Sequence, residues 1–263
     1  MRILVCVCLV AFGPNLFAQG RMAGRATDPS GAARQVLLDY PPTLEWAAGA
    51  NAPQPPPGGT VSVNELSIPA AALRELQQYQ RNFESGNIPD SVKHLEKAIK
   101  IYSHMPAAHQ DLGVCYARLH EYDKAVAEFQ SAATLDGHIV QPEISLAGVY
   151  FLQARYPASE AATRRALAID ASNAGARYLL GRALAAQGQD APETRELLRE
   201  SAAQYPVAHL ILANLLLQKD AKDAALAEFR EYLKQPGAPQ KDKVACTVER
   251  LSGATASAAC ITN

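Results

Sequence analysis

The sequence lacks the charge pattern that would point to nucleic acid or a membrane surface. Its formal net charge is −1 over 263 residues, and removing residues 1–18 takes away only Arg2, which leaves −2. No run rich in lysine or arginine occurs, so the electrostatic footprint of a nucleic-acid-binding protein is missing. We expect a partner that is neither nucleic acid nor an anionic membrane.

Catalytic motifs are also missing. There is no glycine-rich phosphate loop, no zinc-protease helix motif and no nucleophile elbow. The carboxylates are scattered among lysine and arginine, as in "HEYDK" and "EFREYLK", which is typical of solvated helix faces. We therefore expect no enzymatic activity, no catalytic or metal-binding residues and no cofactor.

The N-terminus has the pattern of a targeting segment. Arg2 precedes the apolar run "ILVCVCLVAF", which Gly13 and Pro14 break, and Ala18 suits the last position before cleavage. The pattern predicts a secretory signal peptide over residues 1–18, too short to span a bilayer. The alternatives are an uncleaved anchor or a wrongly assigned start. With the signal removed, we expect no membrane span and a periplasmic or secreted protein.

The expected compartment determines which cysteines remain in the mature chain and whether they can form a disulfide. Cys6 and Cys8 would leave with the signal, and Cys115, Cys246 and Cys260 would remain. An oxidising environment allows one disulfide among three cysteines. Cys115 suits a buried, unreactive thiol, while Cys246 and Cys260 are the candidate pair, although sequence alone does not fix their distance.

The rest of the chain falls into two parts that differ in amino-acid composition. Residues 19–66 include "NAPQPPPGGT", which forms neither a regular helix nor a central strand, so we expect an irregular or disordered proline-rich arm. From about residue 67 the chain reads as helices of roughly 11–15 residues with short loops, and no alternating pattern predicts a sheet.

A repeat runs through the helical part. Shifted by 34 residues, Leu112 aligns with Leu146, Tyr116 with Tyr150, and Ala132 with Ala166. A constant period of this size indicates a stacked helical array.

The repeat resembles the tetratricopeptide repeat, a helical hairpin with small residues at its eighth, twentieth and twenty-seventh positions. In the second copy these are Gly113, Ala125 and Ala132, and large residues surround them. The resemblance implies an all-α, right-handed solenoid of about five repeats over residues 67–239, followed by a cap helix and tail over 240–263. Some positions depart from the motif: Tyr79 stands at the small eighth position, and Asp220 where a turn glycine is usual.

The histidines fit packing better than metal binding. His109 and His209 share the fourth position of the repeat, which is a packing position in the family, and they lie far apart along a solenoid. His94, His104, His120 and His138 are expected on outer faces or turns.

The resemblance also implies a concave groove lined by the first helix of each repeat. Carried over position by position, the groove residues are Leu76, Gln80, Phe83, Gln110, Val114, Arg118, Ile144, Phe151, Leu152, Tyr178, Arg182, Leu210, Asn214 and Leu217. The alternative is that several of them only pack between repeats.

The expected groove is more apolar than polar. It lacks the paired lysine and asparagine with which chaperone-tail-binding members of the family hold a carboxylate. Three aromatic side chains with Arg118 and Arg182 among them suit an amphipathic or extended segment that carries acidic residues. We therefore expect a non-enzymatic scaffold that binds a protein or peptide in a bacterial envelope or secreted space. The alternative is an accessory subunit that docks on a separate enzyme or envelope assembly complex.

Overall fold

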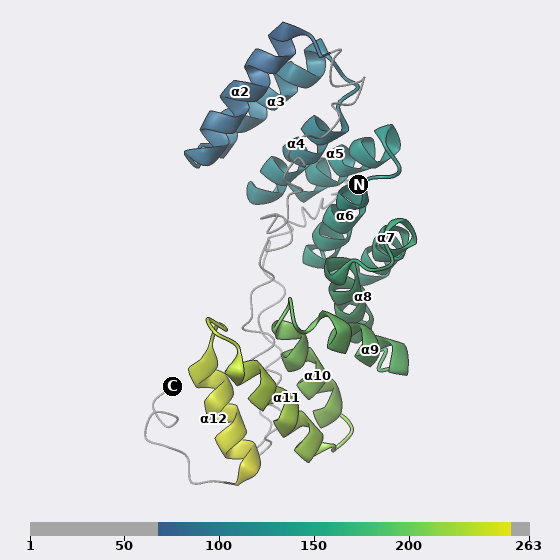
Figure 1. Ribbon diagram of the computed structural model, residues 1–263, viewed down its shortest axis with the longest axis vertical. Helices are drawn as coiled ribbons and strands as arrows, with labels where there is room; N and C mark the ends of the chain where they lie inside the picture. The colour runs from purple at the N-terminus through teal and green to yellow at the C-terminus, as the bar shows by residue number, and fades with distance from the viewer. Residues whose placement is uncertain (1–67, 254–263) are drawn as a thin grey trace, which may run out of the picture.

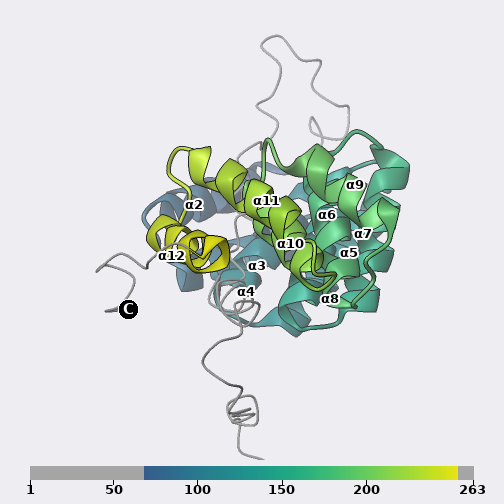
Figure 2. The same ribbon diagram turned by 90° about the horizontal axis from the view of Figure 1, so that it is seen from below.

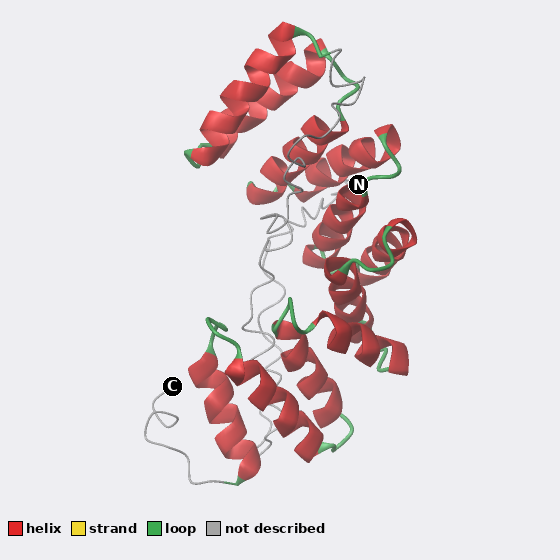
Figure 3. Cartoon of the chain, in the orientation of Figure 1, coloured by secondary structure: helices red, strands yellow, loops and turns green. Residues whose placement is uncertain are grey.

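The computed structural model describes residues 68–253, and every regular element in that range is a helix (Figures 1 and 3). The helices are α2 (Ala70–Glu84), α3 (Ile88–Ile101), α4 (Pro106–Arg118), α5 (Tyr122–Leu135), α6 (Val140–Leu152), α7 (Tyr156–Ile169), α8 (Ala174–Ala186), α9 (Pro192–Ser201), α10 (Val207–Leu217), α11 (Lys222–Lys234) and α12 (Lys241–Ser252). The predicted all-α solenoid is confirmed. The expected signal peptide and proline-rich arm lie outside the described residues and stay predictions.

The helices pair in chain order as five hairpins, from α2–α3 to α10–α11, and consecutive hairpins stack. The stack forms an arc (Figure 1), with α4, α6 and α8 on the inner side and α5, α7 and α9 on the outer side. Seen along the long axis, α2 and α12 lie on one side and α5 to α9 on the other (Figure 2). The first helices of repeats two to four therefore form the inner face of the arc.

One turn geometry recurs inside all five hairpins. The fifteenth residue of each repeat has a positive φ: Gly86, His120, Ala154, Gly188 and Asp220. The next residue donates its N–H to the carbonyl five residues earlier, at 2.8–3.0 Å, as in the bond from Arg155 to Tyr150. This is the Schellman termination of an α-helix, in which a left-handed residue lets the last carbonyls find donors. Three of the five left-handed residues are not glycine and carry a steric cost.

Small residues sit where the two helices of a hairpin approach most closely. A Cβ added to Gly113 would lie 2.5 Å from Cε1 of Phe129, and one added to Gly181 would lie 2.8 Å from Cγ of Leu198. Ala125 is fully buried. The small positions of the repeat thus leave room for the large side chain of the facing helix.

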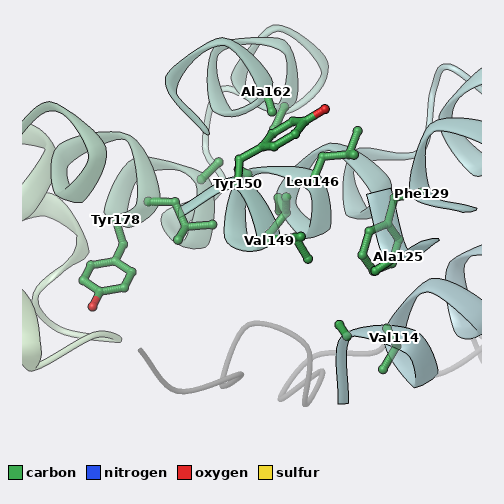
Figure 4. Packing of buried hydrophobic residues seen from close by; sticks show 14 of the residues in the cluster. Val114, Ala125, Phe129, Leu146, Val149, Tyr150, Ala162 and Tyr178 are labelled. Atoms are coloured by element: carbon green, nitrogen blue, oxygen red, sulfur yellow. The ribbon is translucent and has the colours of Figure 1, made fainter. Parts of the chain in front are cut away.

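The buried core is divided into two clusters. The larger one runs from Val92 in α3 to Leu215 in α10, and the packing of α5, α6 and α8 within it is shown in Figure 4. The second joins α10, α11 and α12 around Phe229 and Tyr232. Helix α10 contributes residues to both clusters.

Helix α12 covers the last repeat. Val244 and Leu251 are buried against α11, and Val248 packs beside them. Tyr232 occupies a position that is small in other repeats, and its hydroxyl donates to the carbonyl of Pro239 at 2.6 Å.

The same helix carries Cys246, which is buried. Cys260 lies outside the described residues, so the pairing of these two cysteines stays a prediction. Within residues 68–253, no helix has both the length and the apolar character needed to cross a bilayer.

Candidate functional site

The predicted groove residues all lie on the first helices of the repeats, but they differ in burial. Five of them belong to the buried clusters: Val114, Ile144, Tyr178, Leu210 and Leu217. Gln80 is exposed. The remaining groove residues are half-buried: Leu76, Phe83, Gln110, Arg118, Phe151, Leu152, Arg182 and Asn214. The predicted groove residues therefore combine a buried, mostly apolar set with a half-buried set that includes aromatic, polar and aliphatic side chains.

The first feature of this face joins repeats one and two. The guanidinium carbon of Arg118 lies 4.3 Å from the ring centroid of Phe83, and Phe83 in turn contacts Tyr79 at 5.6 Å between centroids. A guanidinium over an aromatic face is attracted by the ring quadrupole and keeps its donors directed outward. Sequence reasoning placed Arg118 and Phe83 on one surface, and the structure brings them into contact.

The second feature joins repeats three and four. The guanidinium of Arg182 lies 4.1 Å from the ring centroid of Phe151 and 5.9 Å from that of Tyr178. Tyr156 packs against Phe151, and Tyr205 stacks on Tyr178 with centroids 4.7 Å apart and rings within 2° of parallel. Four aromatic rings and one cation thus form a continuous ladder from α6 to the segment before α10.

Sequence reasoning missed two members of this ladder. Tyr156 begins a second helix and Tyr205 lies between helices, so neither occupies a groove position of the repeat. A search for aromatic residues beside the groove positions, and not only at them, would have found both.

The two groove arginines differ from half of the ten other arginines within residues 68–253. Arg164, Arg165, Arg177, Arg195 and Arg199 each form an ion pair with a carboxylate. Neither Arg118 nor Arg182 forms an ion pair with any residue in the range 68–253. Their charges are therefore available to a carboxylate that approaches the inner face.

A half-buried carboxylate, that of Asp111, lies on the same helix as Arg118. Burial raises the pKa of Asp111 to about 6, although a hydrogen bond from the hydroxyl of Tyr79 opposes that rise. The same bond links α2 to α4 and explains why a tyrosine is accepted at the eighth position of the first repeat. Burial also raises the pKa of the Cys115 thiol, one turn further along α4, to about 12. This thiol is buried and free, as predicted, and so is poorly reactive.

Gln110 provides a polar link between repeats two and three. Its Nε2 donates to the hydroxyl of Ser145 at 2.8 Å, and its buried Oε1 has no hydrogen-bond partner. A buried acceptor without a partner costs free energy.

The histidines form another repeated feature, between the two helices of a hairpin. Nδ1 of His109 contacts Glu128, and Nδ1 of His209 contacts Glu228, both at 2.7 Å. His94 makes the same contact with Glu75 and is half-buried, so the expectation of a solvated His94 is wrong. These are charge-assisted links inside hairpins. No cluster of three or more metal-ligating side chains occurs within the described part of the chain.

Comparison with known proteins supports the repeat assignment. The tetratricopeptide repeat family model matches residues 76–138. Stress-induced-phosphoprotein 1 of Caenorhabditis elegans is 22% identical over 258 residues, which cover 90% of this chain and 77% of that protein.

Solved structures share the fold at low identity. PilW, described as a widely conserved type IV pilus biogenesis factor, has a TM-score of 0.61 and 19% identity over 73% of this chain and 90% of its own. MamA of Desulfovibrio magneticus RS-1 has a TM-score of 0.60 and 19% identity over 66% of this chain and 99% of its own. At this level of identity, the similarities show that the fold is shared.

Proposed function

We propose that this chain, which carries tetratricopeptide repeats and has their solenoid fold, is a non-enzymatic scaffold. It binds an extended, acidic segment of a protein partner on its inner face. Repeats of this type form protein-interaction scaffolds. The observation that carries the finer proposal is the pair of guanidinium groups, each stacked on a phenylalanine of the preceding repeat and neither neutralised by a carboxylate of residues 68–253.

The arrangement favours an extended ligand. Arg118 lies in α4 and Arg182 in α8, so the two cations are separated along the array by the helix α6. A ligand that reaches both must run across the helices, and its apolar side chains would meet Phe83, Phe151 and the Tyr178–Tyr205 stack. Aromatic and arginine side chains dominate binding energy most often, because they bury a large area and donate several hydrogen bonds.

The test uses a short fluorescein-labelled peptide in which glutamate alternates with leucine. Its counterpart with lysine in place of glutamate is the ligand control. We expect fluorescence anisotropy to report binding of the acidic peptide alone. Arg182→Glu and Phe151→Ala should each weaken it by at least about 1 kcal/mol, roughly fivefold in Kd.

The matched protein control is Arg230→Glu, which places the same charge change on an exposed arginine of α11, a second helix. It should leave the anisotropy curve unchanged, and circular dichroism should show the same helicity in all variants. Equal binding by the Arg182→Glu variant, or equal binding of both peptides, would exclude this site.

The proposed location is the bacterial envelope or the secreted space. Support comes from the charged start, the apolar run and the small residues at Arg2–Ala18. Intact-mass analysis of protein recovered from its own cells should give a chain that begins near Gln19. A mass that includes Met1 in exported protein would exclude cleavage.

The second candidate is an accessory subunit that docks on a separate enzyme or envelope assembly complex. The similarity to PilW, a type IV pilus biogenesis factor, favours an assembly complex as one setting for this fold. A pull-down from envelope extract with wild-type and Arg182→Glu protein separates the two candidates. Loss of the captured complex in the variant supports binding through the inner face, whereas retention supports docking through another surface.

A further inference from the structure

We propose that residues 36–46 of this chain, "VLLDYPPTLEW", bind to the inner face in cis and compete with the acidic segment of a partner. The inference rests on the proposed function, because it assigns an internal competitor to the same two arginines. It identifies the occupant by its chemistry: an extended segment with two carboxylates, two aromatic rings and several aliphatic side chains.

The composition of this segment complements the inner face. Asp39 and Glu45 provide the carboxylates that Arg118 and Arg182 lack within residues 68–253. Tyr40 and Trp46 provide rings for the aromatic ladder. The Pro41–Pro42 pair favours the extended polyproline conformation, which aromatic-lined grooves accept with little further loss of chain entropy.

The spacing of the charges also fits. Asp39 and Glu45 are six residues apart, which is roughly 19 Å at about 3.1 Å per residue in an extended polyproline conformation. Two steps between packed neighbouring helices, from α4 to α6 and from α6 to α8, cover roughly 16–20 Å at about 8–10 Å per step. The spacing of the two carboxylates therefore matches the separation expected between α4 and α8.

The connection to the array sets the direction of binding. Residues 47–69 join Trp46 to the first residue of α2, and these 23 residues can reach at most roughly 76–83 Å. Glu45 is nearer to α2 in the sequence, so it would pair with Arg118 in repeat two, and Asp39 with Arg182 in repeat four. A tether this short gives an effective concentration on the order of millimolar, so even a weak contact is populated.

The chain contains its own probe, because Trp46 is its single tryptophan. In the full mature chain we expect Trp46 emission at short wavelength and weak quenching by acrylamide. Neutralising the segment with Asp39→Asn and Glu45→Gln should shift the emission to longer wavelength and increase quenching. Arg118→Glu with Arg182→Glu should have the same effect, while Arg230→Glu should have none.

A charge exchange tests the assigned pairing. Asp39→Arg alone and Arg182→Asp alone should each expose Trp46, and the two together should restore the protected emission. The segment variants carry no substitution within the helical array, so they stay informative even if a groove variant unfolds. A wild-type Trp46 as accessible to acrylamide as in the urea-unfolded chain would overturn the proposal, as would indifference to both sets of charge changes.

The labelled acidic peptide separates this inference from the proposed function. If the segment competes, the Asp39→Asn, Glu45→Gln chain should bind the peptide several-fold more tightly than wild type, because its competent fraction is larger. Equal affinities with an exposed Trp46 would overturn the cis contact and leave the proposed function intact. No peptide binding by either chain, with Trp46 still sensitive to Arg182→Glu, would overturn the proposed function and support the cis contact.

Discussion

At the scale of single residues, backbone strain is concentrated in the turns inside the hairpins. Ala154 follows the C-terminal end of α6 and has φ 56°, in the left-handed region where its Cβ is unfavourable. Replacing Ala154 by Gly removes that cost while the glycine adds some unfolded-state entropy, and we expect a net gain of about 0.5–1 kcal/mol. Urea denaturation measures it.

The converse change provides the comparison. Gly188 stands at the same position in repeat four with φ 74°, and nothing lies near a Cβ added there. Gly188→Ala should therefore lose a similar amount through backbone conformation alone. A lower midpoint for Ala154→Gly would show that this turn is not limited by its left-handed residue.

The half-buried carboxylate of Asp111 gives a pH dependence of defined sign. Its pKa is about 6 in the folded chain, above the usual value of 3.8, because burial disfavours the charged form. The folded state therefore holds this proton more tightly than the unfolded state. The resulting destabilisation is fully present above about pH 6 and is relieved as the pH falls toward 4.

Replacing Asp111 by Asn keeps an acceptor for the hydroxyl of Tyr79 and removes the charge. We expect the variant to be more stable than wild type at pH 7, by roughly 1–3 kcal/mol, with the difference disappearing near pH 4. Urea titrations at both pH values measure it. Asp190, whose pKa is lowered to about 2 by hydrogen bonds from Arg195 and Lys219, is present in both chains, so its acid sensitivity cancels in the comparison.

At the scale of helices, each hairpin depends on the close approach at its small positions. Ala125 is fully buried in α5, whereas Ala127, two residues along, is exposed. Ala125→Arg forces a long cation into that contact, and we expect a loss on the order of several kcal/mol. Ala127→Arg introduces the same side chain on the solvent face of the same helix.

Thermal unfolding followed by circular dichroism compares the two variants. We expect a large fall in the midpoint for the first and almost none for the second. Similar midpoints would mean that α5 presents a different face to α4.

The helices were predictable from sequence because small and large residues recur at fixed offsets, as Gly113 and Phe129 do. The groove positions followed from the same register, and Arg118 with Phe83 shows that the register was useful. The ladder was not predictable in full, since the contact of Tyr205 with Tyr178 depends on how repeats four and five stack. Nor was the bond from Tyr79 to Asp111, because it joins two repeats through residues that depart from the motif.

At the scale of the whole chain, the cysteines test how the C-terminal tail is fixed to the array. We predict that peptide mapping without reduction links Cys246 to Cys260 in the exported protein. Cys115 should stay free, and it should react slowly with iodoacetamide in the folded chain because its thiol is buried and its pKa is about 12. In urea it should react rapidly. A free Cys246 in the exported protein would contradict the linkage.

The division of the core into two clusters has a mechanical consequence. Helix α10 shares its side chains between them, so a pulling force applied at the C-terminus meets the α10–α12 cluster first. In a stacked array each repeat contacts only its neighbours, so extension proceeds by detaching the terminal helices before the inner ones. Arg118 and Arg182 belong to helices of the other cluster. A ligand held by these two arginines would therefore stay bound while α11 and α12 detach under force. The last repeat would unfold first and so protect the binding face from the applied force.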